Sequence, residues 1–311
     1  MSVTVHSLIV DPDDLIPRGG DMLKVGRSLL FHQAAVVLLR SLTLRYQGSD
    51  LGRLTPWVFE HAHIADSDCT EFWPYEREDF RDFFWLLNSY YAELNEAGEK
   101  DITHALKVTE TIILPKKNWK VSRREYFANL MRSQGMLLRV LVETVYRKLK
   151  DHGLETQLHF PVSRFKQTYV IGGERYASRP DGAAMVGPQE RRVPILSFAG
   201  WYEGQAWGEF LAEILSIMLG QLARNRNVDS QDQEAFIIGF HGRCIYIARG
   251  YSTSELISRA HLKGCTEDET IEIQFTRGYD LSLKEDWLEA INALARLLRY
   301  LLSGNAKMKT P

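Results

Sequence analysis

The stretch from residue 178 to residue 225 constrains the fold of this chain more than any other part of its sequence. It contains an Arg-Pro-Asp-Gly turn with Asp181, a polar turn, a short apolar segment and a long amphipathic segment. The apolar segment 193–198 has the length and composition of a buried strand. The segment 204–225 repeats apolar residues at helical spacing, so it predicts a helix that packs on that strand. We expect Asp181 to be exposed where the preceding strand ends.

The periodicity of the sequence changes near residue 152. Before it, apolar residues recur at helical spacing; beyond it, short segments alternate between apolar and polar residues, as half-buried strands do. Residues 101–114 fit either pattern. The predicted helices are 21–46, 76–95, 122–151, 204–225, 252–261 and 286–302. The predicted strands are 158–162, 168–171, 174–178, 193–198, 235–240, 243–249 and 271–275.

This order of elements predicts an α/β fold, in which a mixed β-sheet is flanked by helices and follows a mainly helical N-terminal half. We expect an N-terminal lobe over residues 1–120, an α/β core over 121–303 and a frayed tail over 304–311.

The composition of the 311 residues is that of an ordinary globular protein. The net charge of −2 argues against a protein that binds nucleic acid generically, and it leaves room for a local basic patch. The three cysteines are odd in number and widely spaced, which fits reduced thiols. No apolar run is long enough for a membrane span, and the N-terminus lacks the features of a signal peptide. We therefore expect a cytoplasmic or nuclear protein without a membrane partner.

The order of motifs in the second half resembles a known family. Pro180-Asp181 is followed by the strand VPILSF, a helix that carries Gln205, and the hairpin FIIGFHGRCIYIARGY. Over about residues 121–280 this is similar to the PD-(D/E)XK nuclease-like domains common in fungal proteins. The resemblance implies that the second strand should end in E-x-K or D-x-K. In that family the acids bind a divalent metal that activates water, and the lysine positions the nucleophile.

The chain departs from this family where the chemistry should be. Ala199-Gly200-Trp201 occupies the E-x-K position, and there is no lysine between Lys166 and Lys263. The resemblance leaves Asp181 as the catalytic and metal-binding candidate. Its partners would be Glu203 in the catalytic site and Glu125 as a metal ligand, with Glu209 as another candidate acid. Such a set would hold Mg²⁺ weakly.

A structural interpretation of the same acids is equally open. Asp181 can serve as a turn aspartate that accepts hydrogen bonds from nearby backbone N–H groups. The acids of the segment 204–225, Glu209 and Glu213, are expected to be solvated or to favour the helix N-terminus, as is Glu203.

A basic segment, PKKNWKVSRRE, precedes the third predicted helix. Its candidate nucleic-acid contacts are Lys116, Lys117, Trp119 and Lys120, because lysines grip phosphates and an indole stacks on a base. The alternative is a solvated linker that ends in a capping box formed by Ser122 and Glu125.

The segment HAHIADSDC gathers five residues of metal-ligand type: His61, His63, Asp66, Asp68 and Cys69. We favour a polar loop here, because no further ligand follows at a diagnostic distance.

Three functional hypotheses follow. The first is a pseudo-nuclease that binds or scaffolds without cutting, with nucleic acid as its partner. The second is an enzyme that acts on a small molecule in a reused cleft, for example in fungal secondary metabolism. The third is an interaction module whose N-terminal helices, within residues 21–98, bind a protein.

Overall fold

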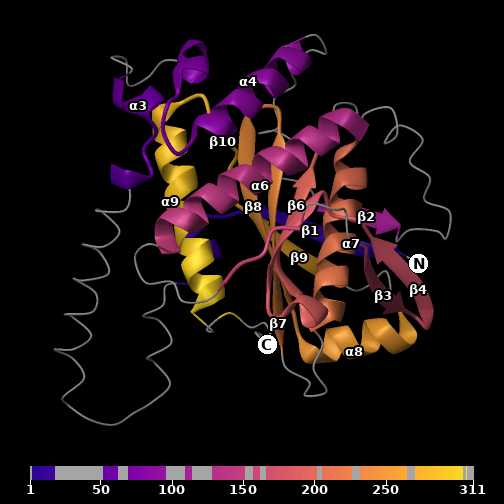
Figure 1. The fold of residues 1–311 in the computed structure, drawn as a ribbon. Coiled ribbons are helices and arrows are strands. Elements are labelled where there is room, and N and C mark those ends of the chain that lie inside the picture. The colour runs from indigo at the N-terminus through magenta and orange to yellow at the C-terminus, as the bar shows by residue number, and fades with distance from the viewer. Residues whose placement is uncertain are drawn as a thin grey trace, which may run out of the picture.

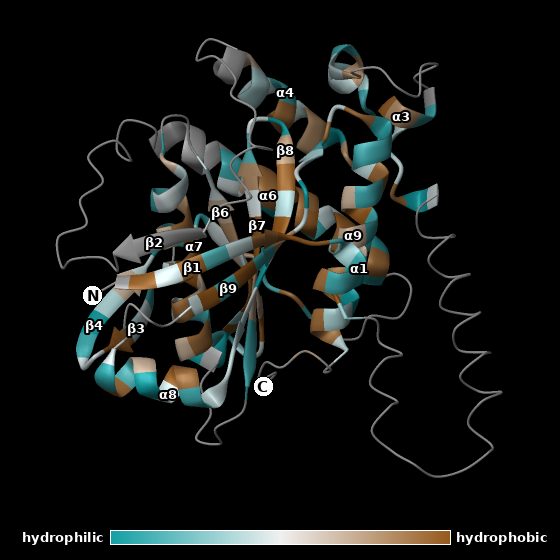
Figure 2. Cartoon of the chain, turned by 180° about the vertical axis from the view of Figure 1, so that it is seen from behind, coloured by the Kyte–Doolittle hydropathy of each residue, from teal (hydrophilic) through white to brown (hydrophobic). Residues whose placement is uncertain are grey.

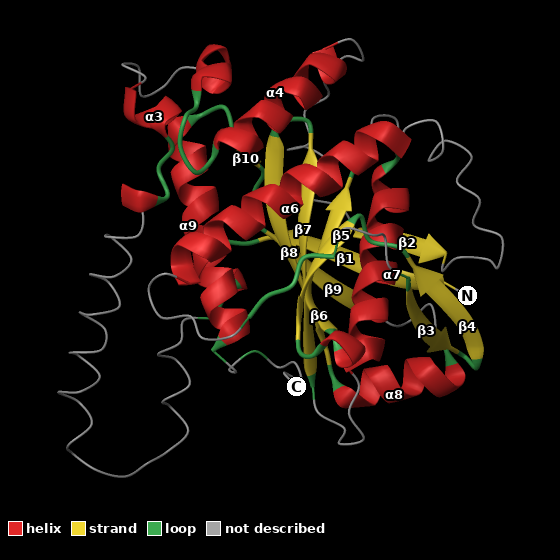
Figure 3. Ribbon diagram, in the orientation of Figure 1, coloured by secondary structure: helices red, strands yellow, loops and turns green. Residues whose placement is uncertain are grey.

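One mixed β-sheet forms the centre of the computed structural model (Figures 1 and 3). The structure describes residues 2–17, 52–61, 69–95, 109–113, 128–150, 157–161, 166–201, 205–225, 232–264, 270–303 and 306. Its strands lie in the order β2-β1-β9-β8-β7-β6-β5, and β10 pairs with β8. The pairs β1–β9 and β6–β7 are parallel, and the other pairs are antiparallel. The α/β class with a mixed sheet flanked by helices is therefore confirmed.

The bounds of the elements follow the predicted periodicity closely in the second half. The strands of the sheet are β1 (Ser2–Ile9), β2 (Thr109–Ile113), β5 (Gly182–Val186), β6 (Val193–Gly200), β7 (Gln233–His241), β8 (Cys244–Ser252), β9 (Thr270–Phe275) and β10 (Tyr279–Asp280). A separate hairpin consists of β3 (Gln167–Ile171) and β4 (Glu174–Ser178). The helices are α1 (Pro12–Leu15), α3 (Trp57–His61), α4 (Arg81–Asn95), α6 (Ala128–Lys150), α7 (Trp207–Asn225), α8 (Ser254–Lys263) and α9 (Lys284–Leu302), with 3-10 turns η2 (Thr70–Tyr75) and η3 (Gln189–Arg191).

Helices cover both faces of the sheet, because its central strands are apolar on both sides. Along β7, Phe236 and Ile238 belong to the hydrophobic cluster that includes α4, α6 and α9. Ile237, between them, belongs to a second cluster that includes α7. Figure 2 shows the apolar colouring along β8 and β9 in the middle of the molecule. The sheet is thus buried between two layers of helices.

The N-terminal residues belong to this sheet. Strand β1 lies between β2 and β9, with Thr4 opposite Thr270. The segment 101–114, which fitted either helix or strand, contains strand β2 in its described part. Predicted strand 158–162 is reduced to a single bridge between His159 and Met185. Predicted helix 21–46 lies outside the described residues.

The aromatic side chains around α4 pack on the C-terminal helix. Phe84 stacks on Trp287 of α9 with ring centroids 5.1 Å apart, and Phe80 meets the same indole edge-on at 5.2 Å. Phe80 and Phe84 therefore belong to the core. Trp85 differs, because 65% of its side chain is exposed on the outer face of α4.

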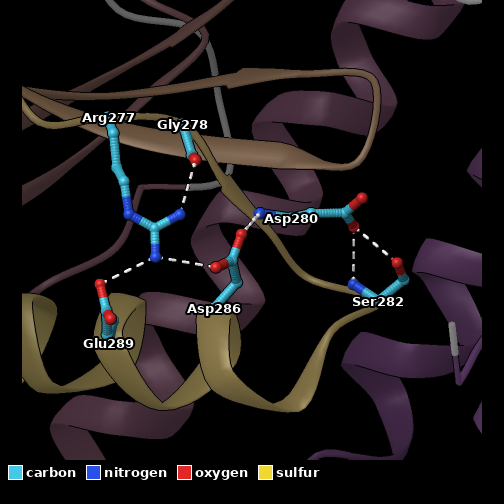
Figure 4. A network of polar contacts seen from close by, with 6 residues as sticks. All are labelled: Arg277, Gly278, Asp280, Ser282, Asp286 and Glu289. Carbon is cyan, nitrogen blue, oxygen red and sulfur yellow. Dashed lines mark hydrogen bonds and ion pairs between the residues drawn. The ribbon is translucent and has the colours of Figure 1, made fainter. Parts of the chain in front are cut away.

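An ion-pair network fixes the start of α9 (Figure 4). The Arg277 guanidinium donates to Oδ1 of Asp286 and to Oε2 of Glu289, each over 2.8 Å. The other oxygen of Asp286 accepts the backbone N–H of Asp280 at 2.7 Å. Asp286 therefore joins β10 to the first turn of α9, where the helix dipole also favours a negative charge.

Candidate functional site

Asp181 lies among helix α6, two antiparallel strand pairs and helix α7. Helix α6 precedes the β3–β4 hairpin, and β5 pairs antiparallel with β6. Helix α7 then connects β6 to the parallel strand β7. Asp181 lies in the turn between β4 and β5, so it precedes a strand and does not end one. It is partly buried, so the expected full exposure is wrong.

Both the main chain and the carboxylate of Asp181 are bound to β6. The N–H of Asp181 donates to the Phe198 carbonyl at 2.9 Å, and the N–H of Gly200 donates to Oδ2 of Asp181 at 2.8 Å. Helix α6 approaches closely from the other side, since a Cβ atom on Gly135 would lie 2.7 Å from the Asp181 carbonyl oxygen. Asp181 accepts a backbone N–H group, as the structural interpretation predicted, but its partner lies on β6.

Ala199 starts a row of paired residues that crosses three strands. It pairs in register with Gly239 on β7, which in turn pairs with Tyr246 on β8. Ala199 and Tyr246 both belong to the hydrophobic cluster on the α7 face. A Cβ atom on Gly239 would lie 1.8 Å from Cζ of Tyr246. The phenol ring therefore lies directly over Gly239, on the face of the sheet to which Ala199 also belongs.

Trp201 is held on every side. Its ring stacks on Phe210 of α7 with centroids 5.1 Å apart and lies 4.6 Å from the ring of His241. Its Nε1 donates to the Gln205 carbonyl at 3.1 Å. Its own carbonyl accepts from Nε2 of Gln134 on α6, at 3.0 Å. With 8% of its surface exposed, Trp201 is a core residue.

His241 is more than the turn residue that its place beside Gly242 indicates. Its Nδ1 lies 3.0 Å from the Trp201 carbonyl oxygen. Because a carbonyl only accepts hydrogen bonds, this nitrogen must carry the proton. His241 therefore helps to hold Trp201 in place at the end of β7.

Glu213 is buried, so the prediction that it is solvated is wrong. It is 6% exposed on the inner face of α7, and its Oε2 accepts from Nε2 of Gln205 at 3.3 Å. Glu209, four residues earlier, is exposed as predicted. Helical periodicity did not predict this burial, because the sequence does not show that Gln205, which precedes the helix, binds Glu213.

The hydroxyl of Tyr246 is buried and feels the charges of both acids. Burial raises the pKa of Tyr246 well above its ordinary value, and the negative charges of Glu213 and Asp181 raise it further. Sequence reasoning missed Tyr246. The available signal was Gly239 inside an apolar strand, because such a glycine often marks a close approach of another group.

Only one of the predicted Mg²⁺ ligands lies among the described residues. Asp181 is described, whereas Glu125 and Glu203 lie outside the described residues. Across the described part of the chain, no three histidine, cysteine or acidic residues gather in a group that could hold a metal.

The structure describes few residues of the other predicted sites. Lys116, Lys117, Trp119 and Lys120 lie outside the described residues, as do His63, Asp66 and Asp68. Cys69 is buried, and its N–H donates to the Ser282 carbonyl at 3.0 Å.

An apolar pocket lies away from Asp181, between α7, α8, β8 and β9. None of its lining residues is ionisable, so it offers no general acid or base. The lining residues are Leu215, Met218, Leu219, Leu222, Gly250, Ser252, Leu256, Ile257, Ala260 and Ile271.

Comparison with known proteins gives no family for this chain: no family model matches it, and no curated protein matches it. Among the helices that the structure describes, none is both long enough and apolar enough to cross a membrane.

Proposed function

We propose that this chain is a nuclease-like protein that binds its partner without cutting it. The observation that carries the proposal is the pairing of a nuclease-type order of elements with Ala199 and Trp201 at the acid and lysine positions. Asp181 supports the same idea, because its Oδ2 already accepts the Gly200 N–H.

Cleavage would need an activated water and a cation to stabilise the developing charge. Trp201 supplies no ammonium group, and its indole is fixed against Phe210 and His241. A guanidinium group is a poor proton shuttle, so Arg179 and Arg224 do not replace the lysine. Among the residues that the structure describes, none supplies the group that would complete hydrolysis.

Incubation with Mg²⁺ or Mn²⁺ tests the absence of cleavage. Purified protein should leave single- and double-stranded DNA and RNA intact over hours. Asp181→Ala serves as the matched variant. Cutting by the wild type that disappears in Asp181→Ala would refute the proposal, whereas cutting that persists in the variant would reveal a contaminant.

Nucleic acid is the proposed partner, bound by Lys116, Lys117, Trp119 and Lys120. Fluorescence anisotropy with labelled single-stranded DNA and RNA should show binding that weakens as salt rises, since phosphate contacts release counterions. Replacing the three lysines by alanine should weaken binding strongly. A control triple variant at the exposed Lys150, Lys166 and Lys263 should bind as the wild type does. Equal affinity of the two triple variants would refute this assignment.

Two other proposals remain. An enzyme that acts on a small molecule, for example in fungal secondary metabolism, would need a larger opening than the small apolar pocket beside Met218 offers. The exposed side chains of Tyr75 and Trp85 favour a protein partner for the N-terminal helices. A cytoplasmic or nuclear location is part of each of these proposals.

A further inference from the structure

The first described residues form an arm that is held by parts of the chain far away in sequence. We call residues 2–16, which comprise β1 and α1, the N-terminal arm. Strand β1 lies between β2 and β9 (Figure 2), so the arm pairs with residues 109–113 on one side and with residues 270–275 on the other. Both partners therefore come from much later in the sequence than the arm itself.

Buried side chains anchor the arm at two places. Val3 and Val5 of β1 are fully buried in the hydrophobic cluster that includes α7. Leu15 and Ile16, at the other end of the arm, are buried in the cluster that includes α9. The arm thus contributes to both hydrophobic clusters, and the body of the protein is incomplete without an arm in this place.

Two arginine side chains hold the end of the arm. Arg249 of β8 donates to the Leu15 carbonyl at 3.2 Å. Arg296 of α9 donates to the Ile16 carbonyl at 3.2 Å and forms an ion pair with Asp13. Guanidinium N–H groups point in fixed directions, so these contacts select the position of the arm on the body.

The connection that follows the arm has more residues than its span requires. Residues 18–51, which are 34 residues, separate the described arm from the next described segment. The arm ends beside Arg296, and the next segment starts beside Trp287, whose Nε1 donates to the Leu54 carbonyl. These two anchors lie nine residues apart on α9, which is about 13 Å along the helix. Because 34 residues can span up to about 115 Å, the arm can also reach the same place on a second copy.

We propose that two copies of this chain exchange their N-terminal arms. In the resulting symmetric dimer, β1 of each copy lies between β2 and β9 of the other copy. The arm makes the same contacts in either arrangement, so exchange is a low-cost route to a dimer. Linked segments meet at an effective concentration on the order of 1 mM, so exchange competes at protein concentrations of that order. The inference goes beyond the proposed function, because exchange requires no nucleic acid.

Disulfide trapping between two different full-length variants tests the exchange. Thr4 on β1 pairs in register with Thr270 on β9. Neighbouring strands lie about 4.8 Å apart, a distance that a disulfide can bridge. A Thr4→Cys chain and a Thr270→Cys chain are mixed at about 1 mM in mild urea, returned to buffer and oxidised. Mass spectrometry should identify a disulfide between positions 4 and 270 that joins the two chains.

Two further samples serve as controls. Thr4→Cys mixed with Ser89→Cys, a change at an exposed position of α4, should give no link between these positions. The double variant Thr4→Cys/Thr270→Cys should form the disulfide within one chain at low protein concentration. A link in the double variant with none between copies would overturn the exchange. No link in either sample would refute the pairing of β1 with β9, on which the exchange depends.

Arg296→Ala distinguishes arm exchange from association through another surface. Arg296 holds the arm in monomer and dimer alike, so its loss should leave the final dimer fraction unchanged. The dimer should form about tenfold faster, because a charge-assisted hydrogen bond no longer delays release of the arm. Arg147→Ala, at an exposed arginine that bonds within α6, should leave the rate as in the wild type. Size-exclusion chromatography measures both quantities, and equal rates in the two variants would overturn the proposal.

Discussion

The phenol ring of Tyr246 lies where the Cβ atom of Gly239 would be, with Cζ 1.8 Å from that position. The two residues are cross-strand partners on β7 and β8. This contact sets the shape of the interior beside α7, because only glycine at position 239 leaves room for the ring. It also explains why a buried hydroxyl lies in the field of Asp181 and Glu213.

Gly239→Ala should therefore destabilise the protein. The added methyl group would meet a fully buried ring that has no room to move, and overpacking of this kind costs about 3 kcal/mol. Urea unfolding measures the loss. The control is Gly52→Ala, because a Cβ atom there would meet nothing within 4 Å. A Gly239→Ala protein as stable as the wild type would show that Tyr246 can move away.

Trp201→Lys restores the side chain that the nuclease resemblance requires and should unfold the site. The change removes the stacking on Phe210 and buries an unpaired charge, so we expect a loss of at least about 3–5 kcal/mol. Trp85→Lys makes the same replacement at a side chain that is 65% exposed, and it should change stability by less than about 0.5 kcal/mol. Similar losses in the two variants would contradict the structure around Trp201.

Stability should fall in alkali partly through Tyr169. Burial raises the pKa of Tyr169 to about 12, against a partly opposing hydrogen bond with Ser216. The unfolded chain loses this proton near pH 10, whereas the folded chain keeps it until about pH 12. The contribution is therefore complete below pH 10 and is lost as the pH rises from 10 to 12, at roughly 1.4 kcal/mol per pH unit.

Urea unfolding at several pH values between 9 and 12 measures that loss. Tyr169→Phe should show a shallower decline, by the equivalent of one proton. Parallel curves for the variant and the wild type would mean that Tyr169 titrates alike in both states.

The two acids that bind Arg277 should differ in importance. Asp286 also accepts the Asp280 N–H and its side chain is 16% exposed, whereas the side chain of Glu289 is 58% exposed. Asp286→Ala should therefore cost about 1–3 kcal/mol, and Glu289→Ala less than about 1 kcal/mol. Thermal or urea unfolding of both variants measures the two losses of stability. A larger loss for Glu289→Ala than for Asp286→Ala would refute this account of the network in Figure 4.

Local pattern predicted much of the second half of the fold. The apolar runs of β6 and β7, the turn at Gly172-Gly173 and the apolar face of α7 are all encoded within short windows of sequence. Both turn glycines have the positive φ angles, 57° and 77°, that such a turn requires.

The candidate site was harder to predict, because it depends on contacts between distant segments. The position of Tyr246 over Gly239 follows from strand register, and the burial of Glu213 follows from the path of Gln205 before α7. The partner of the Asp181 carboxylate is a backbone N–H on another strand, which no side-chain motif reveals. The residues that surround Trp201 could be found only in three dimensions.

The place of β1 between β2 and β9 has a consequence for synthesis on the ribosome. Residues 2–9 are made well before their parallel partner β9, which ends at Phe275. Until β9 is made, β2 is the one strand among the described residues with which β1 pairs, and the resulting ribbon has an open edge. Nascent chains with unpaired edges are prone to associate with one another. We therefore expect the growing chain to need a chaperone or rapid elongation, whereas the folded protein, in which β1 is paired on both sides, does not.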